Sequence, residues 1–248
     1  MGRRPSGTDE LSDSQRIKWE GSPTGGAMPG LEGSGEPISI LTATGIRKRF
    51  GRKLVLDRAS LEVRPGEVVA LVGENGAGKT TLLRILAGLL SADGGEVDAR
   101  GSVGYCPQGP GLIGLLNADE HLRYFGAALG LPDGTALDQG HQLLGDLGFP
   151  VGDPTLARDL SSGNRQKLNL VLALLGDPEI LLLDEPYQGF DHGTYVNFWH
   201  QVRTWRDQGK AIVVVTHLLV ERQRADRLVE LRIPRPSPPG RESTFGAS

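Results

Sequence analysis

Eight residues in the first third of the chain constrain its fold more than any others. Residues 73–80 read GENGAGKT and match the phosphate-loop pattern G-x-x-x-x-G-K-[ST] at every fixed position. Residues 67–72 before them form the continuous apolar run expected of a strand covered on both faces. Residues 80–90 after them have the apolar spacing of a helix. A glycine-rich loop between a strand and a helix is the context that phosphate binding requires.

The chemistry of this loop predicts nucleotide binding. Its glycines let the backbone approach a phosphate without a Cβ clash. Backbone N–H groups and the start of the helix then supply partial positive charge. We expect Lys79 to reach the β- and γ-phosphates and Thr80 to bind Mg²⁺. The loop residues predicted to contact the nucleotide are Gly73, Asn75, Gly76, Gly78, Lys79, Thr80 and Thr81.

Composition excludes several classes of protein. Hydrophobic residues make up 38% of the chain and charged residues 23%, as in ordinary globular domains. The net charge of −3 gives no indication of a nucleic-acid partner. A single cysteine, Cys106, cannot form an internal disulfide, which suits the cytosol. No run approaches the roughly 20 apolar residues of a membrane span, so any membrane role requires an integral partner.

Alternating strand and helix patterns predict an α/β domain over residues 38–233. Residues 1–37 and 234–248 are rich in Gly, Ser, Pro and charge, and we expect a disordered leader and a disordered tail. The alternation between them predicts a mostly parallel sheet with helices around it. Expected strands are 38–44, 54–63, 67–72, 101–105, 179–183 and 211–216, and expected helices are 80–90, 117–129, 135–148, 163–175 and 197–208.

A second motif ends one of the buried strands. Residues 180–185 read ILLLDE, an apolar strand followed by two carboxylates. Alone, this pattern is often a strand that ends in solvent. Beside a phosphate loop, Asp184 is expected near the magnesium bound by Thr80, and Glu185 is placed to polarise an attacking water.

Residues 160–164, LSSGN, resemble the L-S-G-G-Q signature of ATP-binding cassette (ABC) ATPases and stand in that family's order between the other motifs. The resemblance implies that Ser161, Ser162 and Gly163 of one subunit close over ATP held by the phosphate loop of another. The chain departs from the pattern at Ser162 and Asn164. The same serines also suit the N-terminal cap of a helix.

Four smaller matches fit the same family. Gln108 resembles its Q-loop glutamine, which contacts magnesium and water, and His217 resembles its switch histidine, which contacts the γ-phosphate. Asp191 resembles the D-loop aspartate, and Phe50 stands where the family places an aromatic ring against adenine. The resemblance covers about residues 38–232. It implies a P-loop NTPase core with a mostly parallel sheet, a small antiparallel β-subdomain, and a helical subdomain at about 109–165 that carries the signature.

The resemblance implies an ATP-hydrolysing transporter subunit, peripheral on the cytoplasmic face of the cell membrane. Its expected partners are a separate integral permease and a second cassette, in a homodimer or, because Ser162 and Asn164 are atypical, a heterodimer. Residues 112–130 are similar to drug and antibiotic exporters, which favours export. A trimmed β-subdomain, indicated by the short stretch 79–108, also occurs in metal-ion importers. A non-transport ABC ATPase is a further alternative, although the fused cassettes, coiled coil or zinc module of such proteins are not visible here.

Overall fold

The computed structural model describes residues 18–19, 38–109, 111–132, 134–216 and 223–234. The predicted disordered leader and tail therefore lie outside the described residues, apart from 18–19 and Pro234. Among the described residues, no helix is both long and apolar enough to span a bilayer.

A parallel sheet forms the centre of the fold. Its strands are β4 (Val68–Val72), β6 (Val103–Cys106), β7 (Ile180–Asp184), β8 (Ala211–Val215) and β9 (Arg227–Glu230). They lie in the order β6-β7-β8-β4-β9, and every neighbouring pair is parallel. Strands β4, β7 and β8 are buried along their whole length, and all their residues except Asp184 at the end of β7 are apolar, as expected of strands covered on both faces.

A smaller sheet stands beside it. Strands β2 (Leu41–Phe50) and β3 (Lys53–Val63) form an antiparallel hairpin, and β5 (Gly94–Ala99) pairs antiparallel with β2. A two-residue strand, β1 (Lys18–Trp19), pairs in parallel with β5. The order is β1-β5-β2-β3.

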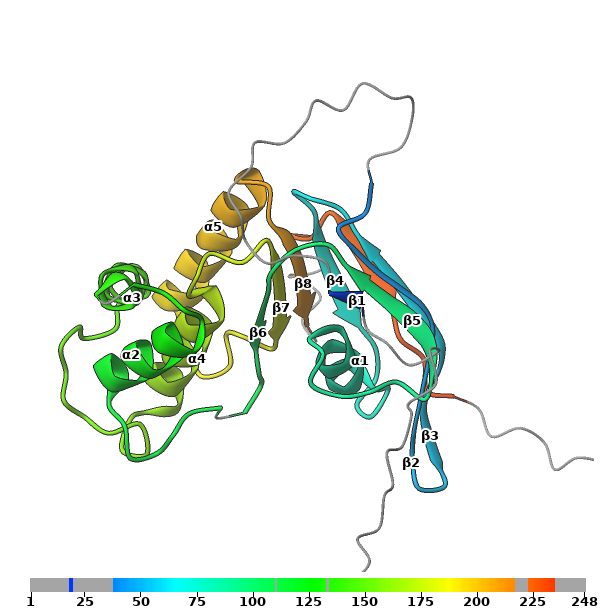
Figure 1. The fold of residues 1–248 in the computed structure, drawn as a ribbon, viewed down its shortest axis with the longest axis horizontal. Coiled ribbons are helices and arrows are strands. Elements are labelled where there is room, and N and C mark those ends of the chain that lie inside the picture. The colour runs from blue at the N-terminus through cyan, green and yellow to red at the C-terminus, as the bar shows by residue number, and fades with distance from the viewer. Residues whose placement is uncertain (1–17, 20–37, 110, 133, 217–222, 235–248) are drawn as a thin grey trace, which may run out of the picture.

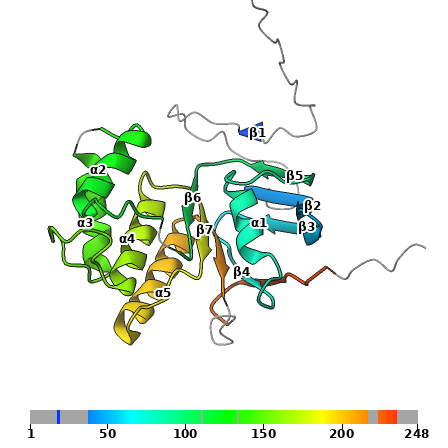
Figure 2. The ribbon, with the colours of Figure 1, turned by 90° about the horizontal axis from the view of Figure 1, so that it is seen from below.

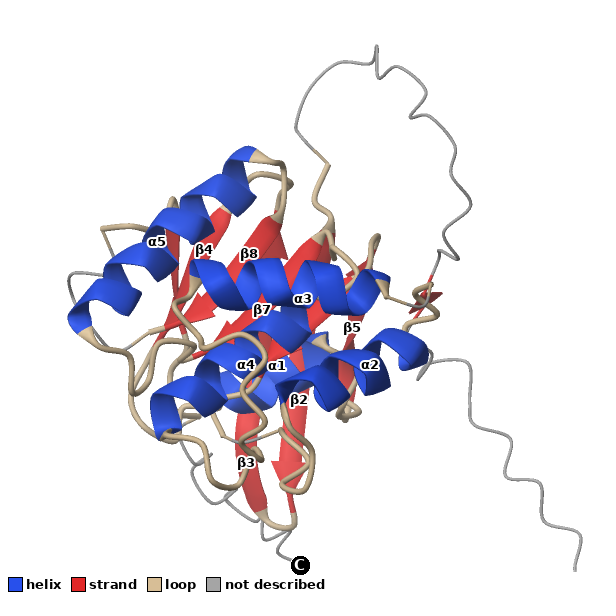
Figure 3. Cartoon of the chain, turned by 90° about the vertical axis from the view of Figure 1, so that its left-hand side faces the viewer, coloured by secondary structure: helices blue, strands red, loops and turns tan. Residues whose placement is uncertain are grey.

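The helices are unequally divided between the two faces of the parallel sheet. Helix α1 (Lys79–Leu86) lies on the side of the small sheet. Helices α2 (Ala118–Ala128), α3 (Thr135–Asp146), α4 (Ser162–Leu174) and α5 (His192–Asp207) lie on the other side. Figures 1 and 2 show this separation from two directions, and Figure 3 shows α2 to α5 in front of the strands.

Two hydrophobic cores follow from this arrangement, because successive strand residues face opposite sides of the sheet. On β7, Leu181 and Leu183 pack into a core with α4 and α5. Ile180 and Leu182 pack into a second core with α1 and the small sheet. The helix after the phosphate loop and the helix that begins at the signature thus cover opposite faces.

The structure differs from the sequence prediction at several elements, among them β1, which lies in the expected disordered leader, and β2, which extends to Phe50 rather than ending at residue 44. Strands β5 and β9 were not among the expected strands. Both are short and partly exposed, so neither has a buried apolar run. Helix α5 begins at His192 rather than 197, because the Asp191 side chain accepts a hydrogen bond from the Thr194 N–H and caps it.

Candidate functional site

The phosphate loop joins β4 to α1 and depends on two glycines. Gly73 has φ 150°, and a Cβ there would collide with the carbonyl oxygen of Leu231. Gly78 has φ 94°, and a Cβ there would lie 2.7 Å from Cδ2 of Leu56 on β3. The loop is therefore held in shape by β3 on one side and by the segment after β9 on the other.

Lys79 is the cation of this loop. Its Nζ donates hydrogen bonds to the carbonyl oxygens of Gly73 at 2.8 Å and Glu74 at 3.1 Å. The residue is only 7% exposed, and its burial lowers the pKa, an effect opposed by the charges of Glu185 and Asp184. An ammonium has three N–H donors, so it can also donate to an anion seated in the loop.

Strand register brings the acidic pair to the same edge of the sheet as the loop. On β8, Val215 is aligned with Leu71 of β4 on one side and with Asp184 of β7 on the other. The ends of β4 and β7 therefore flank the end of β8, about two strand spacings of roughly 4.8 Å apart. The loop, Asp184 and Glu185 meet there, as the sequence predicted from two separate motifs.

Asp184 carries an unusual buried charge. It is fully buried, and no hydrogen bond of ordinary geometry from the described residues reaches either carboxylate oxygen. Burial raises the pKa of the carboxyl and Glu185 adds to the increase, whereas Thr80, Arg84 and Lys79 oppose it. Burying a carboxylate without partners is costly, so this group is expected to have a cation as its partner.

The oxygen ligands here suit Mg²⁺. The Asp184 carboxylate and the neighbouring Thr80 hydroxyl are hard oxygen donors, and Mg²⁺ is commonly held by one or two carboxylates together with substrate phosphates and waters. The described residues contain no group of three His, Cys, Asp or Glu side chains arranged for a metal. A magnesium that enters with nucleotide phosphates needs no such group.

Glu185 and Gln108 are in direct contact. Gln108 lies two residues beyond β6, which pairs with β7, and its Nε2 donates to Oε2 of Glu185 at 3.0 Å. Glu185 adopts φ 49°, a left-handed conformation that costs about 1–3 kcal/mol in a residue with a side chain. Such strain at the end of a buried strand is typical of functional positions.

The signature residues begin α4. Ser161 is the N-cap, and its Oγ accepts a hydrogen bond from the Asn164 N–H at 3.2 Å, so the capping role expected from the sequence is confirmed. A Cβ at Gly163 would lie 2.5 Å from the carbonyl oxygen of Gly189. The start of α4 therefore packs directly against the loop that leads to α5.

Asp191 ends that loop. Its carboxylate accepts hydrogen bonds from the N–H and the hydroxyl of Thr194, at 2.9 Å and 2.7 Å. The hydrogen bond from the Thr194 N–H, then the one from its hydroxyl, lower the pKa of Asp191 to about 2. In this chain the aspartate fixes the start of α5, beside the signature.

Phe50 and His217 are two further residues predicted from the family resemblance. Phe50 ends β2 and is 52% exposed, with Nζ of Lys48 5.7 Å from the ring centroid. Its hairpin reaches the loop through Val55 and Leu56 on β3, which lie against Gly78. His217 lies outside the described residues, which end on this side at Thr216, one residue after β8.

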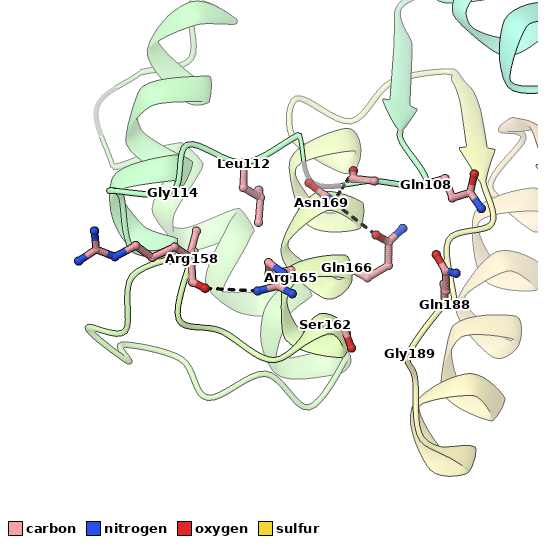
Figure 4. Close-up of a pocket in the computed structure, with 12 residues that line it drawn as sticks. Gln108, Leu112, Gly114, Arg158, Ser162, Arg165, Gln166, Asn169, Gln188 and Gly189 are labelled. Atoms are coloured by element: carbon pink, nitrogen blue, oxygen red, sulfur yellow. Dashed lines mark hydrogen bonds between the residues drawn. The ribbon is translucent and has the colours of Figure 1, made fainter.

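A cavity of about 670 Å³ opens between the helical part and the sheet (Figure 4). It extends from Gln108 to the start of α4 at Ser162. Its lining includes two buried amides, Gln166 and Asn169, that the sequence analysis did not single out. The lining residues are Gln108, Gly109, Leu112, Gly114, Ala157, Arg158, Ser162, Arg165, Gln166, Asn169, Gln188 and Gly189.

Comparison with known proteins identifies the family. The family described as ABC transporter matches residues 56–188, which include the phosphate loop, the signature and the acidic pair. This chain belongs to the ABC transporter ATP-binding family. It is therefore an ATPase of the ABC class, as the resemblance implied.

Curated relatives include ATP-binding subunits named for export and for import. An uncharacterized ABC transporter ATP-binding protein of Methanocaldococcus jannaschii is 35% identical over 75% of this chain and 72% of its own length. A Nod factor export ATP-binding protein I of Ralstonia nicotianae is 35% identical, over 75% of this chain but only 61% of its own length. A zinc import ATP-binding protein of Roseobacter denitrificans is 36% identical over 77% of this chain and 75% of its own length.

Solved structures agree on the fold. The ATP-binding subunit of an ABC transporter superposes with a TM-score of 0.71 at 26% identity, over 79% of this chain and 88% of that one. A dimeric bacterial ABC transporter cassette superposes with a TM-score of 0.72 at 22% identity, over 77% and 94% of the two chains. The P-loop NTPase core, the small antiparallel sheet and the helical part of this chain are those of an ABC cassette.

Proposed function

We propose that this chain hydrolyses ATP to drive export by a separate integral membrane subunit. Binding of ATP between two cassettes closes them, and hydrolysis releases them. The observation that carries the proposal is the convergence of Lys79, Asp184, Glu185 and Gln108 at one edge of the parallel sheet. No single motif brings these four side chains together; the strand order does.

Each side chain has a role that follows from its position. Lys79 neutralises charge on the β- and γ-phosphates, while backbone N–H groups of residues 73–81 hold them. Glu185, oriented by the amide of Gln108, polarises the attacking water and accepts its proton. Phe50 stacks on adenine with its exposed ring, and His217 contacts the γ-phosphate.

Magnesium is the expected cofactor. Thr80, Asp184 and Gln108 are the residues that would hold it, and the buried carboxylate of Asp184, with the Thr80 hydroxyl beside it, supports the assignment. The ion would neutralise charge that develops on the phosphates. Asp184 itself takes no proton in this scheme, because Glu185 is the base.

The site is completed by a second chain. Helix α1 after the phosphate loop and helix α4 after the signature cover opposite faces of the sheet, so we propose that the two motifs of one chain do not meet over one nucleotide. We propose a head-to-tail homodimer about a two-fold axis, in which Ser161, Ser162 and Gly163 of each copy contact the nucleotide of the other. The nearby Asp191 lies in the same interface. The dimeric cassette among the structural neighbours supports this arrangement.

The membrane subunit is proposed to dock in the cavity beside Gln108. The cavity has a volume of about 670 Å³ and extends from Gln108 to the start of α4, and we propose that it receives a short helix of the membrane subunit. This places the chain on the cytoplasmic face of the membrane, where ATP is available. Export is favoured by the Nod factor exporters among its relatives, and import is the second candidate because a zinc importer is equally similar.

The decisive experiment removes the phosphate-loop cation. We expect Lys79→Ala to weaken ATP binding at least tenfold in calorimetry and to abolish hydrolysis, because the main cation facing the phosphates is lost. The matched control is Lys210→Met. Lys210 is equally buried and hydrogen-bonded to the carbonyl of Pro178, but it lies away from the loop. ATP affinity that is unchanged in Lys79→Ala, or lost equally in both variants, contradicts the assignment.

The membrane partner is tested separately. Purification of the full chain from its own cell membranes is expected to recover one integral protein in stoichiometric amount. An exporter-type permease supports the proposal. A metal-ion permease transfers the assignment to import, and a ribosome or DNA-repair complex in its place contradicts transport.

A further inference from the structure

Two buried amide side chains on α4 lie against the Q-loop, residues 107–109. Gln166 is 5% exposed and Asn169 is 4% exposed. They stand three residues apart, so they lie on the same side of the helix. Burying an amide side chain costs free energy unless its donors and acceptors form hydrogen bonds. The hydrogen-bond partners of Gln166 and Asn169 therefore show which segments these side chains fix in place.

Both amides donate hydrogen bonds to the Q-loop, and Gln166 also donates to Cys106 at the end of β6 while Asn169 donates to Gln166. Nε2 of Gln166 donates to the carbonyl oxygen of Pro107 at 3.2 Å and to Sγ of Cys106 at 3.5 Å. Nδ2 of Asn169 donates to the carbonyl oxygen of Gly109 at 3.4 Å and to Oε1 of Gln166 at 3.3 Å. Figure 4 shows the Asn169 bonds, with Gln166 beside them and Gln108 close by.

These bonds bracket Gln108. The carbonyls on either side of it, at Pro107 and Gly109, are held by α4, while its own side chain donates to Glu185. Helix α4 is thus linked to the proposed catalytic carboxylate by hydrogen bonds to the backbone of the Q-loop and, through Gln108 itself, by the side-chain bond to Glu185. Helix α4 begins at Ser162, directly after its N-cap Ser161 in the signature.

Separation of α4 from Cys106 and the Q-loop would break three hydrogen bonds and leave their buried N–H donors without acceptors, whereas the bond from Asn169 to Gln166 lies within α4 and would remain. Each unsatisfied buried donor costs more than an ordinary hydrogen bond contributes. The Q-loop is therefore expected to move with α4 rather than independently of it.

We propose that Gln166 and Asn169 are positioning residues that fasten the Q-loop to the signature helix and so hold Gln108 against Glu185. A shift of α4 when its signature engages the nucleotide of a second cassette then moves Gln108 directly. This inference rests on the proposed roles of Gln108 and Glu185 in ATP hydrolysis.

The same helix provides a matched control. Lys167 is 7% exposed, and its Nζ donates to the carbonyl oxygen of Gly148 at 3.3 Å. It is a buried side chain of α4 that holds a loop carbonyl, as the two amides do, but its bond leads to the end of α3 and not to the Q-loop. Lys167→Met therefore removes a similar hydrogen bond, from the same helix to a different loop.

The experiment measures ATP hydrolysis by the full-length chain, with thermal melting to confirm folding. Asn169→Leu and Gln166→Leu are expected to lower kcat about tenfold with KM for ATP within about twofold, because one or two positioning bonds are lost. Asn169→Asp, which keeps the shape but not the donor, is expected to behave like Asn169→Leu. Lys167→Met is expected to melt at a lower temperature with kcat unchanged.

A double-mutant cycle separates positioning from general destabilisation. In a Gln108→Ala background, Asn169→Leu is expected to lower kcat no further, because the residue acts through Gln108. The inference is overturned if the double variant loses kcat by the product of the two separate losses, or if Lys167→Met loses as much kcat as Asn169→Leu. If instead Glu185→Gln and Lys79→Ala retain full activity, the proposed function itself fails.

Discussion

Replacement of Asp184 by asparagine is expected to stabilise the nucleotide-free protein while abolishing its activity. The carboxylate is fully buried, no hydrogen bond of ordinary geometry reaches it, and Glu185 adds repulsion. Leaving a buried polar group unsatisfied costs about 1–3 kcal/mol. Asparagine keeps the shape and removes the charge, but its amide also lacks full bonding. We therefore expect a gain of about 1–2 kcal/mol, or roughly 2–8 °C in melting temperature for a domain of this size.

The stability difference between Asp184→Asn and the wild type is expected to depend on pH. Burial first, and then Glu185, raise the pKa of Asp184 above its ordinary 3.8, so the folded state binds the proton more tightly than the unfolded state does. The wild type therefore loses stability as pH rises through the raised pKa. The advantage of Asp184→Asn is expected to be small below pH 3.8, where the carboxyl is protonated in both states, and to increase toward neutral pH.

Thermal melts of both proteins between acidic and neutral pH, without nucleotide or magnesium, measure the difference. The control is Asp207→Asn, because Asp207 is exposed and paired with Arg206, so its carboxylate carries no burial penalty. A variant at position 184 that melts below the wild type at neutral pH would refute the reasoning. It would show that the carboxylate is satisfied in the nucleotide-free protein.

Two further predictions concern stability. Gly163→Ala is expected to lower the free energy of unfolding by about 1–3 kcal/mol, because the new Cβ would meet the carbonyl oxygen of Gly189. The control, Gly145→Ala, lies on open surface of α3 and should raise the free energy of unfolding by about 0.5–1 kcal/mol. Equal melting temperatures for the two variants would contradict this prediction. Asp191→Ala is expected to lower the melting temperature, because it removes the hydrogen bond from the Thr194 N–H that caps α5. The difference in melting temperature from wild type should disappear as pH falls from 3.8 through about 2, where the Asp191 carboxylate becomes protonated. Asp191→Asn should retain most of the cap, and a pH-independent difference between Asp191→Ala and wild type would argue against the bond.

Local motifs made the nucleotide-binding end of the site predictable. The GENGAGKT loop and the ILLLDE strand each carry their chemistry within eight residues or fewer. Their juxtaposition follows from parallel strands ending at one edge, which the apolar runs already indicated. The sequence therefore predicted that Lys79, Asp184 and Glu185 would meet.

Elements without such signals were missed. Strand β5 reads GGEVDA and is only partly buried, so its strand character comes from pairing with β2 and not from an apolar pattern. The first turn of α5 contains Gly193 and Thr194, which are weak helix formers, and the Asp191 cap holds it.

The contacts of Gln166 and Asn169 could not be predicted either. Polar residues within a helix are ordinarily solvent-facing, and only the fold shows that these two are buried against the Q-loop. The available signal was their spacing: both lie on one side of a helix that is otherwise largely apolar beyond its first turn. Without knowledge of what that side faced, the spacing indicated no partner.

Light scattering of Glu185→Gln with and without ATP tests the central claim most directly. The variant keeps the shape of the site and removes the general base, so hydrolysis is expected to slow by about 10²- to 10⁴-fold while ATP stays bound. The account predicts a monomer without nucleotide and a doubled mass with ATP and Mg²⁺. Adding Lys79→Ala should abolish the doubling. A monomer under both conditions at high protein concentration would contradict a nucleotide site shared between two copies of this chain.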